Sequence, residues 1–432
     1  MRPPYTTYVD QPLLAHVFTN EQITKLYNRS TGEGSDDEIP ADLAHHFLLA
    51  ICTHPGVGVC FKDRGWYPRV AGDDMGPIQG SNDETAPKSA LIYNKILAHL
   101  LKTLKVNEDP RQQELALRIF SACPELVCGC VAPLYCGSHC LTKSSYWSSA
   151  PLTLEPRLSS KWIANIAFFG NVISLPAPEE SFFLPGSPLY QPTPPPLSSF
   201  LENTFPSVNT KAHFSRGILS TSPLVQHCTA LALAKCLTKY SGVLRIVRKT
   251  EFELEEGESN GQWKKRRNEL ELEARRRVPD FQVIIAFSQK TGEYIQVAPG
   301  DAIVAARQPG KVRIAMLAES STRLLWLYHL CFPSLVAEAR FDVGKLLQNL
   351  FDNEAGAEHI AGSTSGLDTL RRLHVLRLLR ESDQFLWSSK SGEFRTQETY
   401  LKLTSSARNP LIYQHPPTCL RFCRRHGDSR RN

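Results

Sequence analysis

Apolar residues recur at three- and four-residue steps along most of the chain, a spacing that predicts amphipathic α-helices. The clearest stretch is 157–176, RLSSKWIANIAFFGNVISLP, where Ser159 or Ser160 can cap the first amides and a proline ends the helix. Ala167 and Phe168 widen the apolar stripe until most of the helix surface is apolar. We therefore predict an inner helix that is covered on nearly every side. Its stripe consists of Trp162, Ile163, Ile166, Phe169, Val172 and Ile173.

Two other helices have apolar stripes that predict which face is buried. A helix that starts at Pro40 and stops before Pro55 carries Leu43, Phe47, Leu48 and Ile51. A helix that starts at 366–368 carries Leu370, Leu373, Leu376 and Leu379. Similar patterns predict helices at 89–104, 109–123, 222–237, 280–287 and 313–331, followed by one or two short helices at 333–350. The segments 56–60 and 294–297 are short strand candidates.

Helix-start signals support two of these predictions. In Asp109-Pro110-Arg111-Gln112 the aspartate is a cap, the proline occupies the first turn and the glutamine stands where a capping-box partner would be. Ser222 precedes Pro223 in the same way. We expect a helix to begin directly after each cap.

The helix predicted at 259–277 is charged on nearly all sides and differs from the others. Two basic clusters lie roughly three turns apart on it, so both could contact phosphates. Glutamates at 269, 271 and 273 could instead pair with the neighbouring arginines on a solvated face. The candidate RNA-binding residues are Lys264, Lys265, Arg266, Arg267, Arg275, Arg276 and Arg277.

Successive helices of ten to twenty residues with short breaks predict an all-α protein, built as a HEAT- or armadillo-like helical repeat, or α-solenoid. A globular all-α bundle is the alternative, because no sharp repeat period is visible. A Pro-rich connector interrupts the helices, since Pro192, Pro194, Pro195 and Pro196 exclude regular helix. Both termini are expected to be irregular.

These patterns divide the chain into five segments. An N-terminal extension occupies 1–40 and a basic irregular tail occupies 391–432. Between them we predict helical repeats at 41–176 with an insertion at 128–145, the connector at 177–221, and helical repeats at 222–390.

Composition places the chain among ordinary folded proteins. It has 432 residues, 42% hydrophobic and 21% charged, with a net charge of +6 that permits contact with nucleic acid without requiring it. The sequence has no apolar run of the roughly 18–20 residues that span a bilayer, and we expect no signal peptide. The twelve cysteines are therefore expected to be reduced thiols. Cys52, Cys228, Cys236 and Cys331 stand within apolar helical patterns, where cysteine packs as a small hydrophobe.

Two groups of cysteine and histidine could in principle bind zinc. Cys123, Cys128, Cys130, Cys136, His139 and Cys140 lack the paired C-x₂-C spacing of zinc ribbons and fingers. His415, Cys419, Cys423 and His426 lie in the basic tail. We expect neither group to hold a metal, and no other metal site is predicted.

No signature of catalysis or cofactor binding is present. The chain has no G-x₄-G-K-[ST] phosphate loop, no His-Glu-x-x-His and no dinucleotide fingerprint. Residues 362–366 read GSTSG, with a threonine where a nucleophile elbow needs serine. We expect a protein that is not an enzyme and needs no cofactor.

Several long, ordered blocks of the sequence together carry a family resemblance, and none of them is a catalytic signature. They are DRGWYP (63–68), LKVNEDPRQQELALRIFSACPELV (104–127), LEPRLSSKWIANIAFFGNVISLP (154–176), SRGILSTSPLVQHCTALALAKCL (215–237), GQWKKRRNELELEARRRVPDFQVIIAFSQ (261–289), RLLWLYHLCFPSLVAEARFDVGKLL (323–347) and LHVLRLLRESDQFLWSSKS (373–391). These blocks resemble the nucleolar pre-ribosomal-associated (Urb/Npa) family of large-subunit ribosome assembly factors. The resemblance extends from about residue 42 to 391, and the first and last forty residues or so match nothing in the family.

The resemblance implies a non-enzymatic scaffold in early 60S pre-ribosome assembly and large-subunit rRNA maturation in the nucleolus. Implied partners are precursor rRNA, early pre-60S particles, a sister Urb-type protein, a DEAD-box RNA helicase and other assembly factors. Trp66 and Tyr67 in DRGWYP could stack on bases or pack as a loop anchor. Family members are several times longer, so the chain would be a portion of such a protein. The alternative is a helical-repeat adaptor for protein complexes or transport that makes no RNA contact.

Overall fold

The computed structural model describes 22, 25, 27, 40–54, 59–60, 95–122, 147, 152–177, 179–184, 187–256, 261–296, 310–339 and 365–382. Within these ranges the regular structure is helical, with one isolated bridge between Phe183 and Tyr190 and no strand. The all-α prediction is confirmed. The α-helices are α3 (Pro40–Cys52), α4 (Lys95–Thr103), α5 (Pro110–Ala122), α8 (Ser160–Ser174), α9 (Leu197–Thr204), α10 (Lys211–Ile218), α11 (Pro223–Glu253), α12 (Gln262–Arg277), α13 (Phe281–Gln296), α15 (Lys311–Cys331), α16 (Pro333–Ala337) and α18 (Ser365–Glu381).

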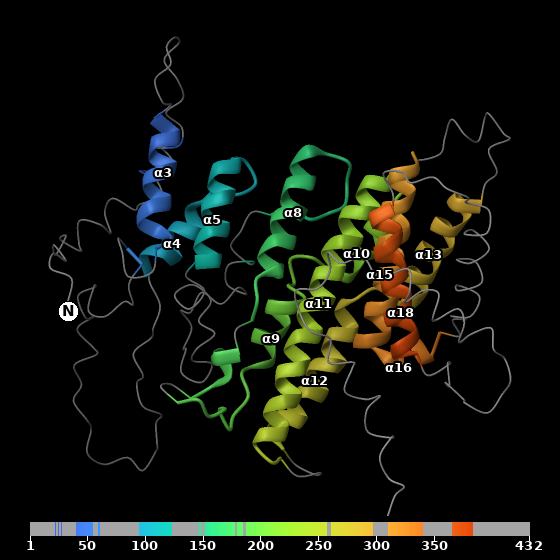
Figure 1. Cartoon of the computed structure of the whole chain (residues 1–432). Coiled ribbons are helices and arrows are strands. Elements are labelled where there is room, and N and C mark those ends of the chain that lie inside the picture. The colour runs from blue at the N-terminus through green and yellow to red at the C-terminus, as the bar shows by residue number, and fades with distance from the viewer. Residues whose placement is uncertain are drawn as a thin grey trace, which may run out of the picture.

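Six of these helices form a continuous row through the molecule (Figure 1). In this row α3 packs on α5, α5 on α8, α8 on α11, α11 on α15, and α15 on α18. The helices α9, α10 and α12 pack against α11, and α13 packs against α15. An extended row with flanking helices is compatible with a repeat architecture, but α11 contacts five other helices instead of only its neighbours in a stack. The helical-repeat assignment therefore stays a prediction.

The stretch predicted as an inner helix is α8. The Ser159 side chain accepts a hydrogen bond from the Trp162 amide at 3.2 Å, as an N-cap residue does. The indole Nε1 of Trp162 donates to the Leu154 carbonyl at 3.2 Å, so this large side chain is buried with its polar atom paired. Phe168 and Phe169 are also buried, because α5 and α11 cover opposite sides of the helix.

The longest described helix, α11, is the centre of the core. It has 31 residues and is buried on several faces, because α8, α9, α10, α12 and α15 surround it. Tyr240 lies between Phe205 and Phe332, with ring centroids 5.3 Å from each. Within the part of this helix that was predicted at 222–237, Val225, Cys236 and Leu237 are buried, while Leu224 is 46% exposed.

The buried faces of α3 and α18 agree only in part with the predicted stripes. On α3, Leu43 and Phe47 are 51% and 58% exposed, and His45 is buried instead. On α18, Leu370 is 43% exposed, and His374 is buried. Both predictions are partly correct, since Leu48 and Leu379 are buried as expected. They miss the histidines for the same reason: a polar ring can be buried when a partner pairs with it, and the partners come from distant parts of the chain.

The connector predicted at 177–221 contains regular structure that the sequence patterns did not reveal. The helices α9 and α10 lie within it, and Thr210 caps α10 by accepting a hydrogen bond from the His213 amide at 3.2 Å. The four prolines that were expected to exclude helix, Pro192 and Pro194–Pro196, lie outside helices, and α9 begins directly after Pro196. The strand candidate at 294–297 is also wrong for its first three residues, which belong to α13.

The described cysteines pack as predicted. Cys52, Cys236 and Cys331 are buried, and Cys228 is half-buried. Burial raises the pKa of the Cys331 thiol to about 12, so this group is neutral and unreactive at physiological pH. Among the described helices, none combines the length and apolar character needed to cross a bilayer.

Candidate nucleic-acid interface

The charged helix α12 is held against the core by a narrow apolar stripe. Trp263, Leu270 and Ala274 are fully buried, and they repeat at seven and four residues. The Trp263 Nε1 donates to the Gln191 carbonyl at 2.9 Å, which ties α12 to the Pro-rich segment 72 residues away. Phe182 meets the same indole edge-on at 6.1 Å.

A carboxylate from the preceding turn caps the start of α12. Glu255 has a φ of 47°, and the amides of Glu255 and Glu256 donate to the carbonyls of Phe252 and Glu251 in a Schellman ending of α11. This turn directs the Glu256 carboxylate onto the amides of Trp263 and Lys264, at 3.0 and 3.1 Å. A negative group at this position also interacts favourably with the helix dipole.

Most of the candidate RNA-binding cations on α12 form ion pairs within the chain. Arg267 contacts Glu251 at 2.8 Å, and both side chains are largely buried. Arg277 contacts Glu202 at 2.7 Å and also donates to the Phe205 carbonyl at 2.7 Å. The remaining pairs are Arg266 with Glu269, Arg275 with Glu338, and Arg276 with Glu273. The intrahelical pairing that the sequence left open is therefore present, and several cations also join α12 to other helices.

The outer face of α12 is still positively charged. Lys265 and Arg276 are exposed, and Asn268 and Leu272 lie between them on the same side. Exposed ion pairs such as Arg276–Glu273 are weak, at about 0.2–1 kcal/mol, so a phosphate could compete for the arginine. The exposed cations of α12 are therefore fewer than the seven candidates from the sequence, whose binding to RNA stays a prediction.

A second group of cations, missed in the sequence, lines a pocket of about 390 Å³ between α8, α11 and α15. We call it the basic pocket. Its charged residues are Lys235, Lys239, Arg245 and Arg323, and none of the described residues that line it is Asp or Glu. The first three follow one another along α11, but Arg323 belongs to α15, almost 80 residues later. No local motif could have revealed this grouping, because only helix packing brings the residues together.

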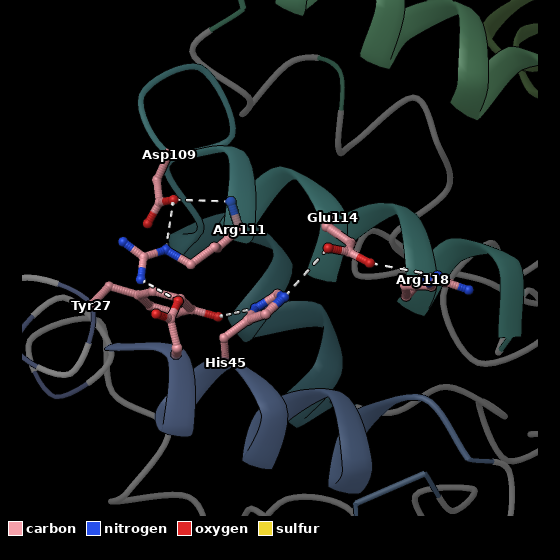
Figure 2. Close-up of polar contacts among 7 residues, drawn as sticks. Tyr27, His45, Asp109, Arg111, Glu114 and Arg118 are labelled. Atoms are coloured by element: carbon pink, nitrogen blue, oxygen red, sulfur yellow. Dashed lines mark hydrogen bonds and ion pairs between the residues drawn. The ribbon is translucent and has the colours of Figure 1, made fainter. Parts of the chain in front are cut away.

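Polar contacts at the opposite end of the row join α3 to α5 (Figure 2). The Tyr27 hydroxyl and His45 Nδ1 are 3.2 Å apart, and Glu114 lies 3.6 Å from the other ring nitrogen of His45. Arg111 contacts Asp42 of α3 at 2.7 Å. Burial raises the pKa of Tyr27, so its hydroxyl stays protonated. These contacts position two helices, so we assign them a structural role.

The other candidates from the sequence lie outside the described residues. These are the cysteines of 123–140, the tail residues of 415–426, the insertion at 128–145, and Trp66 and Tyr67. Within the described part of the chain, no group of three or more His, Cys, Asp or Glu residues could hold a metal.

In α5 of the N-terminal region, the Asp109 carboxylate accepts from the Arg111 amide at 2.9 Å, as predicted for a cap. Gln112 does not complete a capping box, because its side-chain oxygen Oε1 accepts a hydrogen bond from the Lys105 amide at 2.8 Å instead.

Comparison with known proteins finds a family match in this N-terminal region. Residues 16–165 match the model of the Npa1 family, described as "Ribosome 60S biogenesis N-terminal". This segment of the chain resembles the Npa1 family. The resemblance seen in the sequence is confirmed. The match begins at residue 16, so the expectation that the first forty residues or so match nothing in the family was wrong for most of them.

A relative supports the same assignment. The chain is 23% identical over 287 residues to the nucleolar pre-ribosomal-associated protein 1 of Saccharomyces cerevisiae. That alignment covers 62% of this chain but only 14% of the yeast protein, so the chain spans a small part of its relative's length. No solved structure matches the chain.

Proposed function

We propose that the protein acts in 60S ribosome biogenesis as a non-enzymatic helical scaffold in the nucleolus. The observation that carries this proposal is the match of residues 16–165 to the Npa1 family. The name of the yeast relative, a nucleolar pre-ribosomal-associated protein, supports both the process and the compartment.

The architecture suits this role. A row of helices presents a long surface on which several partners can lie at once. We propose that precursor rRNA and early pre-60S particles bind this surface, together with a sister Urb-type protein and a DEAD-box helicase. Energy for binding would come from many weak protein and phosphate contacts, and ATP-driven steps would belong to the helicase.

Association with large-subunit precursors tests the role directly. A tagged form of the full-length protein should sediment with pre-60S particles from nuclear extracts, and its depletion should cause unprocessed large-subunit rRNA to accumulate. The proposal would be contradicted if the tagged protein sedimented only as free protein, away from pre-60S particles, and rRNA processing were unchanged after depletion.

The exposed cations of α12 are the proposed phosphate contacts on that helix. Replacing both basic clusters by alanine would also break the Arg267–Glu251 and Arg277–Glu202 pairs, so folding and binding effects would be mixed. A sharper variant is Lys265→Gln with Arg276→Gln, because both side chains are exposed. Crosslinking to RNA should fall, and its salt dependence should become shallower. The neutral Asn268→Ala change on the same face is the control.

A helical adaptor without RNA contact is the second candidate. The internal ion pairs of α12 favour it, because a cation used to join two helices is less available to a phosphate. Ultraviolet crosslinking to precursor rRNA in cells decides between the two functions. Absence of crosslinks from a protein that still enters large assemblies would support the adaptor.

A further inference from the structure

The basic pocket is built from residues that converge on one face of α11. Lys235, Lys239 and Gly242 follow each other at four and three residues, so they share that face, and Arg245 lies three residues further on. The last residues of α8 and the residues that follow it, 173–177, form the opposite wall. Arg323 enters from α15.

Part of this positive charge has a structural use. The Lys239 ammonium donates to the Leu175 carbonyl at 2.8 Å, and the Lys235 ammonium donates to the Asn171 side chain at 3.2 Å. Both contacts place a cation near the C-terminus of α8, where the helix dipole is negative. One or two lysines are sufficient for this purpose. Arg323 and Arg245 are therefore left without a role in capping α8.

Arg323 carries a polar atom that nothing in the described structure satisfies. Its Nε is buried and has no hydrogen-bond acceptor among the described residues. A buried donor without an acceptor is costly, so a ligand oxygen that reached this atom would stabilise the structure. A guanidinium matches phosphate oxygens particularly well, because its donors form a planar fork.

The charges in and beside the pocket repel one another. Burial lowers the pKa of Lys235, and the neighbouring Arg323 lowers it further. On α18, burial together with Arg380 and Arg323 lowers the pKa of Arg377. Nearby carboxylates are already engaged, since Glu179 pairs with Lys249 and Glu319 pairs with His374. An anion in the pocket would relieve this repulsion.

The cations continue beyond the pocket, and this favours a polyanion over a single phosphate. Arg377 lies over the Trp326 ring, 4.7 Å from its centroid, and the His374 ring stacks on the same indole at 5.5 Å. Basic groups next to a partly exposed aromatic ring are typical of surfaces that follow a nucleic-acid strand. The positive surface thus extends from α11 across α15 to α18.

We propose that the basic pocket binds a backbone phosphate of single-stranded RNA, with Lys235, Arg245 and Arg323 as the contacting residues. This inference rests on the proposed role in pre-60S assembly and adds a second RNA contact, on a surface distinct from α12. The strand then continues over α15 toward Arg377 on α18.

Gly242 offers a way to test the pocket without removing any of its residues. A Cβ built on this glycine meets no atom within 4 Å, so larger side chains fit there. Gly242→Asp places a carboxylate among the cations, and Gly242→Asn adds nearly the same volume without charge. Binding of the 432-residue chain to a labelled oligouridine is measured by fluorescence anisotropy across a series of salt concentrations.

We expect the wild-type chain and Gly242→Asn to bind the oligouridine with equal affinity. Gly242→Asp should bind it at least about tenfold more weakly. Arg323→Gln should reduce the slope of log affinity against log salt by about 0.7, the value for one phosphate on a single strand. Equal binding of the Asp and Asn variants overturns the inference. Binding of inorganic phosphate without any binding of oligouridine overturns the assignment to RNA.

The two proposals fail in different ways. If the wild-type protein enters pre-60S particles but Gly242→Asp binds RNA normally, only the pocket is wrong. If Gly242→Asp abolishes RNA binding but the protein never enters those particles, the pocket stands and the proposed function is wrong. Thermal unfolding of each variant confirms that the chain is folded in every comparison.

Discussion

At the scale of single residues, glycines in helices show how closely the elements approach. Gly217 of α10 faces α11, where a Cβ would lie 2.2 Å from the Thr229 hydroxyl and 2.7 Å from its methyl group. Thr229 is buried and β-branched, so it cannot move aside easily. Gly242, in contrast, faces open space in the basic pocket. A side chain is therefore excluded by close packing at Gly217 but fits without contact at Gly242.

Alanine at these two positions should change stability in opposite directions. Gly217→Ala should lower the free energy of unfolding by about 1–3 kcal/mol, because the added methyl overpacks the contact between α10 and α11. Gly242→Ala should raise it by about 0.5–1 kcal/mol, because alanine favours the helix. Urea unfolding followed by circular dichroism measures both. Adding Thr229→Ala to the Gly217 variant should restore part of the loss, and no restoration would contradict the steric explanation.

At the scale of elements, the existence of a helix was easier to predict than its orientation. The apolar surface of α8 is so wide that any orientation buries most of it, and the Ser159 cap was visible in the sequence. The helices α3 and α18 have narrower stripes, so their orientation also depends on polar contacts. His45 and His374 are buried because Tyr27 and Glu319, which lie far away in the sequence, pair with them. The basic pocket could not be predicted for the same reason, since Arg323 reaches it only through packing.

The contact between α15 and α18 should make stability depend on pH. Burial opposes ionisation of Glu319, but the hydrogen bond from His374, the charges of His374 and Arg323 and the nearby His227 together hold the pKa of its carboxyl below the usual value. Burial also lowers the pKa values of His227 and His329. All three groups then bind more protons in the unfolded chain than in the native protein, so stability falls on acidification.

The loss should begin when the unfolded histidines start to titrate. We expect the free energy of unfolding to be highest above about pH 6.5 and to fall by on the order of 1 kcal/mol by about pH 5.5, with the Glu319 contribution lost only at still lower pH. Urea unfolding at a series of pH values gives this curve. His227→Gln should flatten its upper part, because one buried histidine no longer titrates. A curve that rises toward acid pH would show that the assignment is wrong.

At the scale of the whole molecule, stability is concentrated in the middle of the row. The helix α11 is covered by five helices, and α15 is covered by α11, α13, α16 and α18. The helices α3 and α12 contact fewer elements, and α12 keeps a broad polar face. Elements with fewer buried contacts open at a lower free energy than the core.

Native-state hydrogen exchange should reproduce this gradient. We expect the slowest amide exchange in 229–247 of α11 and 317–331 of α15, and faster exchange in α3 and in the outer turns of α12. Mass spectrometry of peptic fragments from the intact protein resolves these segments. Uniform protection across all helices would mean that the row unfolds as one cooperative unit.

The close contact between α8 and α11 at the basic pocket has an evolutionary consequence. Lys235 lies across Gly170, where a Cβ would be 3.2 Å from its Cδ and 3.3 Å from its Nζ. The long side chain therefore needs the bare backbone beneath it to reach Asn171. Natural sequences should show these two positions varying together: a bulkier residue at 170 should accompany a shorter one at 235, and a lineage that keeps the lysine should keep the glycine.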